Sequence, residues 1–369
     1  MFMSSTNRVN ILTVLNEPNY GAQLQAYATY KAVESLGYEP RMIYLSMDFR
    51  SRAYSLRNRM LLPVYSWLKG YSHAFAKAKA FGRRHMPNQT RMFPTPAHLR
   101  QESWDVSDTY LVGSDQVWNP SIVGGLLDSY CLGFLPDECS RRISYASSFG
   151  SARWREAIEK KMDFDLMRRF RALGVREAFG CNLLADHGIE ATEVIDPTLL
   201  QADYRHLIVD GPISPDADAT GHILFLCLSD VPEQQRFVDE LSKRFGLPVK
   251  KVYGYLQPSA ATNRRFLDVE DWLYAISTAS VVGTDSFHAS VFSIIFHRPF
   301  YVYISEPSKA DRITNIFGRL GVPADRITAD ASTCSLDSRI DWDEVDARRA
   351  KEREHGLNFL MNALKKAEE

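Results

Sequence analysis

The chain has 369 residues, more than one ordinary hydrophobic core accommodates, so we expect two domains. Its hydrophobic share of 45% and charged share of 24% are typical of a globular protein and exclude a disordered chain. The formal net charge of −1 gives no indication of a nucleic-acid partner, and no apolar run reaches the roughly 18 residues of a membrane span.

Apolar strands alternate with helices in the first half of the chain. Residues 8–16 predict a buried strand, residues 20–37 a helix that stops at Gly37, and residues 41–45 a second strand. A strand, a helix and a second strand in this order imply a parallel sheet. Further strands are expected at 110–113, 144–150, 173–175 and 192–195, and further helices at 154–170 and 178–187.

Residues 46–103 interrupt this alternation as a basic insertion. The segment holds eleven Lys and Arg against two acidic residues, so its formal charge is +9 and the rest of the chain carries about −10. We favour a solvated helical hairpin. The alternatives are contact of residues 50–84 with an anionic membrane surface, or binding of a phosphorylated substrate.

Residues 210–221 are rich in Pro, Gly, Asp and Ala and predict a linker between two domains. A second alternating set follows, with strands at 222–228, 249–255, 281–283 and 300–304, and helices at 233–245, 268–279, 288–296 and 311–320. An amphipathic helix is expected over 341–366. We therefore predict domains over 1–209 and 210–340, each a doubly wound α/β unit, and a C-terminal helix in 341–369.

The cysteines and the absent motifs narrow the chemistry. The five cysteines are scattered and form no CxxC pair, so neither a zinc site nor a disulfide framework is expected. No Walker loop, GxSxG, HExxH or GxGxxG motif occurs. We expect a cytoplasmic protein without a metal requirement, located at the inner membrane face if the basic insertion binds lipid.

Polar side chains follow several predicted strands. In the first half these are Asp115, Ser147 with Ser148, and Arg176, and in the second half they lie in the segment 284–290 around His288. Because the carboxyl ends of parallel strands share one edge of a sheet, these groups predict a ligand cleft. His288 is the one side chain of the segment 284–290 that can change its charge near neutral pH. The alternative is a capped helix in which His288 is an ordinary core residue.

Six motifs together resemble the polysaccharide pyruvyl transferase family, in its SFHG-like branch. They are NYGAQLQAYA from Asn19, GSDQVWNP from Gly113, SYASSFG from Ser144, VRE from Val175, DPTLL from Asp196 and TDSFHASVFSIIFHRPF from Thr284. The resemblance implies two Rossmann-like domains in a GT-B-like arrangement, with the last helix packing back on the first domain. It also implies transfer of pyruvyl from phosphoenolpyruvate to two hydroxyls of a sugar, without a cofactor.

The resemblance also implies roles for individual residues. Arg176 and His288 match an Arg and a His of the family, so Arg176 is expected to anchor the donor, while His288 binds its phosphate and acts as general acid. Asp115 is the candidate general base, although an Asp at a strand end more often caps a turn. Ser286 stands where one branch of the family carries Arg, so a cation must come from elsewhere, or the Ser286 hydroxyl and the helix N-terminus bind the donor in its place. The nearest candidates are Arg298, Lys309 and Arg312.

The first domain is expected to bind the sugar acceptor, free or lipid-linked. Asn19 also fits an ordinary N-cap, and Asp196 fits a turn between a strand and a linker. Amide, hydroxyl and aromatic groups suit sugar hydroxyls and rings, and the candidates are Asn19, Tyr20, Gln23, Ser114 and Gln116.

Two other functions fit the same sequence. A GT-B glycosyltransferase that uses a nucleotide sugar would share the architecture, because fold alone does not fix function. A non-catalytic glycan-binding member of the family is the other alternative, since Ser286 removes a cation from the donor site.

Overall fold

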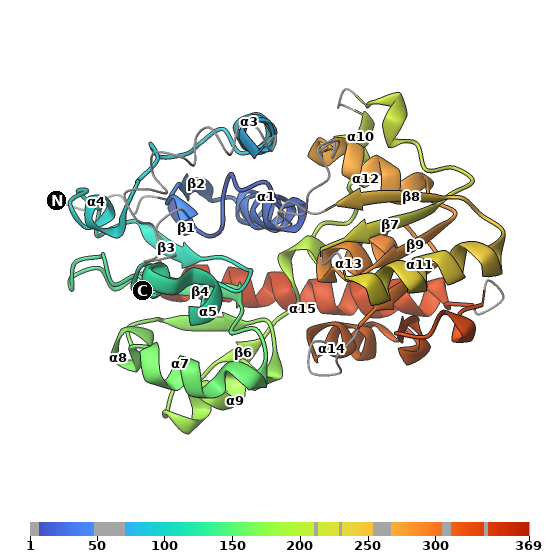
Figure 1. Ribbon diagram of the computed structural model, residues 1–369. Helices are drawn as coiled ribbons and strands as arrows, with labels where there is room; N and C mark the ends of the chain where they lie inside the picture. Colours follow the sequence, from blue (N-terminus) through green and yellow to red (C-terminus); the bar gives the residue numbers. More distant parts are fainter. Residues whose placement is uncertain are drawn as a thin grey trace.

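The computed structural model describes residues 7–47, 71–209, 213–228, 231–253, 267–304, 311–335 and 339–368. Two parallel β-sheets organise this part of the chain, and Figure 1 shows them side by side with helices packed around them. The predicted α/β class with two Rossmann-like units is confirmed.

The first sheet has six strands in the order β2-β1-β3-β4-β5-β6, and all its pairs are parallel. Every residue of β3 and β4 is buried, as expected for strands that helices cover on both faces. The strands are β1 (Arg8–Leu12), β2 (Glu39–Ile43), β3 (Thr109–Val112), β4 (Arg142–Ser147), β5 (Ala172–Val175) and β6 (Thr192–Glu193).

The second sheet has five parallel strands in the order β11-β10-β9-β7-β8. In each sheet the first strand lies between the second and the third, so successive connections leave it in opposite directions. Such a switch point opens a crevice at the carboxyl ends of the strands. The strands are β7 (Ile223–Cys227), β8 (Val249–Tyr253), β9 (Val281–Thr284), β10 (Phe300–Tyr303) and β11 (Ile327–Thr328).

The helix predicted over 154–170 is wrong as a single element. Met162 adopts an extended ψ of 132°, and the Asp163 side chain accepts hydrogen bonds from the first backbone N–H groups of a new helix. The helices of this half are α1 (Tyr20–Ser35), α3 (Tyr71–His85), α4 (Pro96–Arg100), α5 (Pro120–Val123), α6 (Leu127–Tyr130), α7 (Arg155–Lys161), α8 (Phe164–Met167), α9 (Ala178–Asp186) and α10 (Arg205–Val209).

The last helix connects the two halves of the molecule. It begins beside α14 of the second half and runs across β3, β4 and β5 of the first sheet (Figure 1). The predicted return of this helix to the first domain is confirmed, whereas the domain boundaries stay a prediction. The helices of the second half are α11 (Pro232–Phe245), α12 (Val269–Thr278), α13 (Phe287–Ile295), α14 (Asp311–Leu320) and α15 (Trp342–Glu368).

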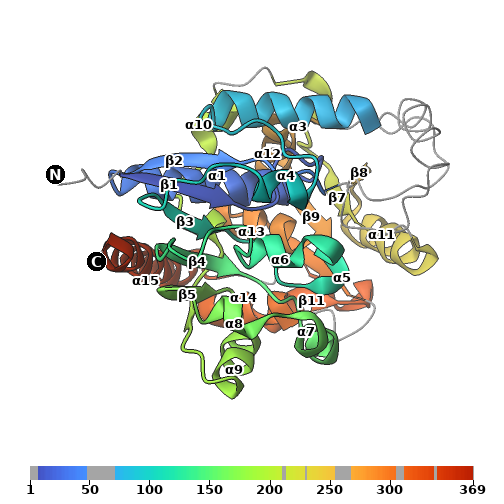
Figure 2. The same cartoon turned by 90° about the vertical axis from the view of Figure 1, so that its left-hand side faces the viewer.

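The described part of the basic insertion packs against the second domain. Helix α3 lies over α1 and α12 (Figure 2). Its Lys77 pairs with Asp268 at 3.2 Å, and its Arg84 pairs with buried Glu270 at 2.5 Å. Two of the cations therefore stabilise the domain contact. Residues 50–70 of the predicted membrane contact lie outside the described residues. In the part of the chain that the structure describes, no helix is long and apolar enough to span a membrane.

Candidate active site

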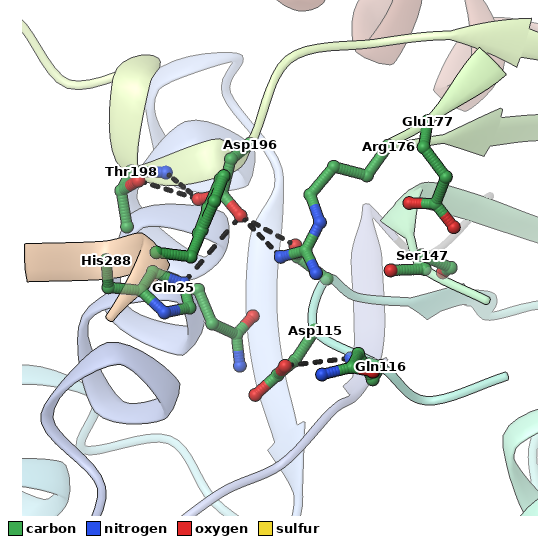
Figure 3. A network of polar contacts seen from close by, with 12 residues as sticks. Gln25, Asp115, Gln116, Ser147, Arg176, Glu177, Asp196, Thr198 and His288 are labelled. Carbon is green, nitrogen blue, oxygen red and sulfur yellow. Dashed lines mark hydrogen bonds and ion pairs between the residues drawn. The ribbon is translucent and has the colours of Figure 1, made fainter. Parts of the chain in front are cut away.

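The first turns of α1 and α13 meet between the two sheets. Helix α1 follows β1 and α13 follows β9, so each begins at the carboxyl edge of its own sheet. Ser286 caps α13, because its hydroxyl accepts a hydrogen bond from the Ala289 N–H at 3.4 Å. His288 lies in the first turn of α13 and faces polar groups of the first domain (Figure 3).

Asp196 holds this polar network together, as Figure 3 shows. Its Oδ2 accepts hydrogen bonds from Arg176 Nη1 at 2.9 Å and from Ser114 Oγ at 3.2 Å, and it lies 3.8 Å from His288 Nε2. Its Oδ1 accepts two hydrogen bonds from Thr198, at 3.0 and 2.6 Å. The carboxylate is fully buried and links both domains.

Burial and charge shift the pKa values of this network. Burial alone would raise the pKa of Asp196, but His288, Arg176 and the Thr198 hydrogen bonds hold it below the ordinary value. Burial lowers the pKa of His288 despite the nearby carboxylates of Asp196 and Asp115. For Arg176, burial is outweighed by the surrounding carboxylates, which raise its pKa. The imidazole is therefore mainly neutral at pH 7, beside an ion pair.

Several side-chain nitrogens of the cluster have no hydrogen-bond partner among the described residues. Nε and Nη2 of Arg176 and Nε2 of His288 are buried without a hydrogen bond. The guanidinium groups of Arg176 and Arg312 lie 5.0 and 5.7 Å from the ring centre of Phe287. Burial, followed by repulsion from Arg176, lowers the pKa of Arg312 to about 10. Since uncompensated buried donors are costly, this arrangement fits an anionic ligand.

A small pocket between the domains is lined by part of this cluster. Arg176, Glu177 and Asp196 come from the first domain, whereas Phe287 and Arg312 come from α13 and α14 of the second. Glu177 accepts a hydrogen bond from the Phe149 N–H at 2.6 Å, and burial raises the pKa of its carboxyl. The other lining residues are Ile195, Asn315, Ile316 and Arg319.

Asp115 lies at the end of β3 in a left-handed conformation, with φ of 78°. Its Oδ1 accepts a hydrogen bond from the Gln116 N–H at 2.8 Å, so part of the carboxylate does cap the turn. Figure 3 places its side chain close to Gln25, below Arg176. Its charge reaches His288, Arg176 and Arg312, so the carboxylate belongs to the cluster.

The predicted acceptor residues take different positions. Asn19 is the N-cap of α1, and Gln23 donates to the Glu17 carbonyl at 2.8 Å while its buried Oε1 has no partner among the described residues. Gln116 lies beside Asp115 and accepts a hydrogen bond from Asn119 at 2.9 Å. Asn19 and Gln23 also line a pocket at the start of α1.

Tyr20 does not present its ring to a sugar. The ring stacks on Trp272 of α12, with centroids 5.3 Å apart and planes at 12°. Its hydroxyl accepts a hydrogen bond from the Leu267 N–H at 3.0 Å and donates to the Leu267 carbonyl at 3.3 Å. Burial raises its pKa. The predicted stacking role is corrected, because Tyr20 joins α1 to the second domain.

Of the candidate replacement cations, Arg312 reaches the cluster and Arg298 does not. Arg298 precedes β10 and donates to the Phe296 carbonyl at 3.1 Å, at the end of α13 opposite to His288. Nine helical residues separate the two ends by about 14 Å, since each residue adds about 1.5 Å. Lys309 lies outside the described residues.

Asp196 is the site residue that sequence reasoning assigned to a turn. It does begin the short helix at Pro197–Leu199, but its other oxygen faces Arg176 and His288. An Asp directly after a strand end was the available signal, and it was equally consistent with a plain turn. Gln25 was also missed, and it is buried in α1 with its amide bonded to Thr13 Oγ1 at 3.0 Å.

A larger groove lies elsewhere on the molecule. It is bordered by Arg171 and Thr192, where β5 and β6 begin, and by Phe359 and Lys366 of α15. It contains none of the predicted site residues, and it opens at the opposite edge of the first sheet from Asp115 and Arg176. The interdomain cluster is therefore the better candidate for the chemistry, although its pocket is smaller.

The comparison with protein families gives one match. A family model described as polysaccharide pyruvyl transferase matches residues 19–307. That span includes Asp115, Arg176, Asp196 and His288, whereas Arg312 lies just beyond it. No curated protein matches the chain.

Solved structures resemble the fold at low sequence identity. A proposed UDP-N-acetylglucosamine 2-epimerase from Listeria monocytogenes has a TM-score of 0.52 and 12% identity, with 98% of this chain and 96% of that chain covered. A UDP-N-acetylglucosamine 2-epimerase from Rickettsia bellii has a TM-score of 0.50 and 10% identity, covering 97% and 96%. The complex of S. aureus MnaA with UDP gives 0.50 and 11%, covering 88% and 85%. These likenesses confirm a GT-B-like arrangement of two Rossmann-like domains.

Proposed function

Because the chain belongs to the polysaccharide pyruvyl transferase family, we propose that it transfers pyruvyl from phosphoenolpyruvate to two hydroxyls of one sugar, forming a cyclic ketal. The observation that carries the proposal is the cluster of Arg176, Arg312 and His288, in which buried nitrogens of Arg176 and His288 lack partners among the described residues. Phosphoenolpyruvate brings a phosphate and a carboxylate, which suit such donors.

The reaction needs one proton donor and one proton acceptor. Protonation of the enol methylene gives a methyl group and makes C2 electrophilic, so a sugar hydroxyl adds there and loses its proton. The bond between C2 and the phosphate oxygen then breaks, and phosphate leaves. The second hydroxyl closes the ring at C2 and loses its proton as well, which balances the protons taken up by the methyl group and the phosphate.

The donor-binding roles follow from position. Arg176 keeps two buried N–H groups available while Asp196 holds its Nη1, so one face of the guanidinium is fixed and the other can bind an oxyanion. Arg312 supplies the cation that the position of Ser286 lacks. Ser286 contributes by capping α13, whose N-terminal end favours negative charge.

His288 is the proposed general acid and phosphate ligand. Its imidazole is mainly neutral in the free protein because burial lowers its pKa. A bound phosphate adds negative charge beside the ring and raises the pKa, so donor binding charges the acid that the reaction uses. Asp196 then orients the imidazole from 3.8 Å.

Asp115 is the proposed general base for the attacking hydroxyl. Among the described residues, one of its oxygens accepts a turn hydrogen bond, from the Gln116 N–H, and the carboxylate belongs to the same cluster as the donor site. We propose that Asn19, Gln23, Ser114 and Gln116 bind the acceptor, and the buried Oε1 of Gln23 has no partner among the described residues. We propose that the acceptor is a sugar of an exopolysaccharide precursor, free or lipid-linked, bound from the side of the first domain.

Phosphate release from phosphoenolpyruvate in the presence of a panel of sugar acceptors tests this function. We expect acceptor-dependent release in the wild type and a loss of about 10²-fold or more in His288→Ala, the range of general acid catalysis. His98→Ala is the control, because His98 is exposed on α4. Undiminished turnover in His288→Ala would refute its role.

Thermal unfolding with ligands separates this function from a nucleotide-sugar transferase. A ligand that binds the native state alone raises the unfolding temperature. We expect stabilisation by phosphoenolpyruvate and none by UDP sugars. The reverse result would favour the glycosyltransferase, and stabilisation by glycans alone would favour a binding protein.

A further inference from the structure

Gly21 of α1 lies directly against His288 of α13, at the contact between the two domains. A Cβ atom built on Gly21 would fall 2.9 Å from Cβ of His288, and closer still to Cγ and Nδ1 of the ring. Real Cβ atoms almost never approach another heavy atom so closely. The imidazole of His288 therefore occupies the space in which any other residue at position 21 would carry its side chain.

The space left by the missing side chain of Gly21 is filled by His288. All three nearest atoms to the built Cβ belong to His288, and none belongs to another residue. Gly21 is a buried residue of the first turn of α1 and is absent from the described glycines with positive φ. An Ala is thus allowed by the backbone, and in a helix it is intrinsically preferred to Gly.

The imidazole has little room to retreat. On its own helix, the Phe287 ring lies edge-on at a centroid distance of 5.1 Å. Asp196 Oδ2 lies 3.8 Å from Nε2. Ala289 and Ser290 of α13 are buried, so the helix itself cannot shift without disturbing the core.

We propose that Gly21 is a positioning residue of the active site, which sets where the imidazole of His288 stands relative to Asp196 and the bound donor. The proposal rests on the transferase function proposed above. Gly21 has no side chain that could take part in the chemistry, and it acts by leaving space for the imidazole. Gly21 lies between Asn19 and Gln23 in the first turn of α1. The helix that is proposed to bind the acceptor therefore also contacts the imidazole of His288, the proposed general acid.

A double-mutant cycle in thermal unfolding tests the steric part. We expect Gly21→Ala to lower Tm in the wild-type background and to leave it unchanged or raise it in the His288→Ala background. Gly318→Ala is the matched control, because Gly318 is also helical but has open space around its built Cβ. An equal effect of Gly21→Ala in both backgrounds would overturn the proposal.

Steady-state kinetics test the functional part. We expect Gly21→Ala to reduce kcat by about a hundredfold, the cost of a displacement near 1 Å, and to move the alkaline limb of the pH profile. Gly318→Ala should match the wild type in both respects. Activity of Gly21→Ala within twofold of the wild type, with an unchanged pH profile, would contradict the proposal. A wild type that releases no phosphate would instead refute the proposed function, while the unfolding cycle would still judge the steric claim.

Discussion

At the scale of single residues, the site depends on the buried carboxylate of Asp196, which lies against Arg176, Ser114, Thr198 and His288. Asp196 compensates Arg176 at 2.9 Å and faces His288 at 3.8 Å, and neither oxygen is left without a donor. Breaking such a buried pair leaves an uncompensated charge, which costs more than the pair itself contributes. The carboxylate therefore supports both the fold and the position of the donor-binding groups.

We predict that Asp196→Asn destabilises the protein by about 3–5 kcal/mol, because the Arg176 guanidinium stays buried without its counter-charge. Urea unfolding measures the free energy. Asp137→Asn is the control, since that carboxylate is 83% exposed in its pair with Arg169 and should contribute little. Equal stability of the two variants would show that the buried pair is dispensable.

The titration of His288 predicts a pH dependence of stability. Its folded pKa lies below the ordinary 6.5, so the unfolded chain binds more protons below that pH. The contribution of His288 is thus fully present above pH 6.5 and is lost as the pH falls towards the folded pKa. Urea unfolding at pH 7.5 and 5.5 should show a smaller loss in His288→Gln than in the wild type. An identical loss would assign the dependence to other groups.

At the scale of elements, one face of α14 brings Arg312 to the first domain. Asn315 donates to Glu193 at 3.1 Å, and Arg319 pairs with Glu193 at 3.4 Å and with Glu352 of α15. Positions 312, 315 and 319 lie on the same side of a helix. The ion pairs near the end of α14 thereby fix the beginning of the helix, where Arg312 flanks Phe287.

We predict that Arg319→Gln raises KM for phosphoenolpyruvate several-fold with a smaller change in kcat, because Arg312 is less firmly placed. Combination with Glu193→Gln should add little, since both changes remove the same contact. Arg348→Gln is the control, because its pair with Glu344 is exposed along α15. Fully additive effects on KM would argue against a shared role.

Periodicity predicted the elements well, whereas contacts between distant elements could not be read from it. The alternation of apolar strands and helices located all the strands that carry site residues. The break at Met162 was missed because the apolar pattern continues through it and only the cap at Asp163 marks the new helix. Tyr20 was misassigned because its partner Trp272 lies on the other domain, far along the chain.

At the scale of the whole molecule, the site exists only where the two domains meet. Arg176, Asp196 and Asp115 come from the first sheet, and His288 and Arg312 from the second half. Family motifs identify Asp115, Arg176, Asp196 and His288, since each follows a strand, whereas Arg312 lies outside the motifs. Their order in space, with Asp196 at the centre, required the docking of one domain on the other, which no local pattern encodes.

The path of α15 has a consequence for synthesis on the ribosome. The strands β3, β4 and β5 are complete once residue 175 has emerged, but the helix that covers them, α15, begins only at Trp342. Until then Tyr145 and Gly174, which pack near Phe359 in the finished protein, lack that cover. During translation, an apolar face of the first sheet therefore stays without its helix until residues 342–368 have been made.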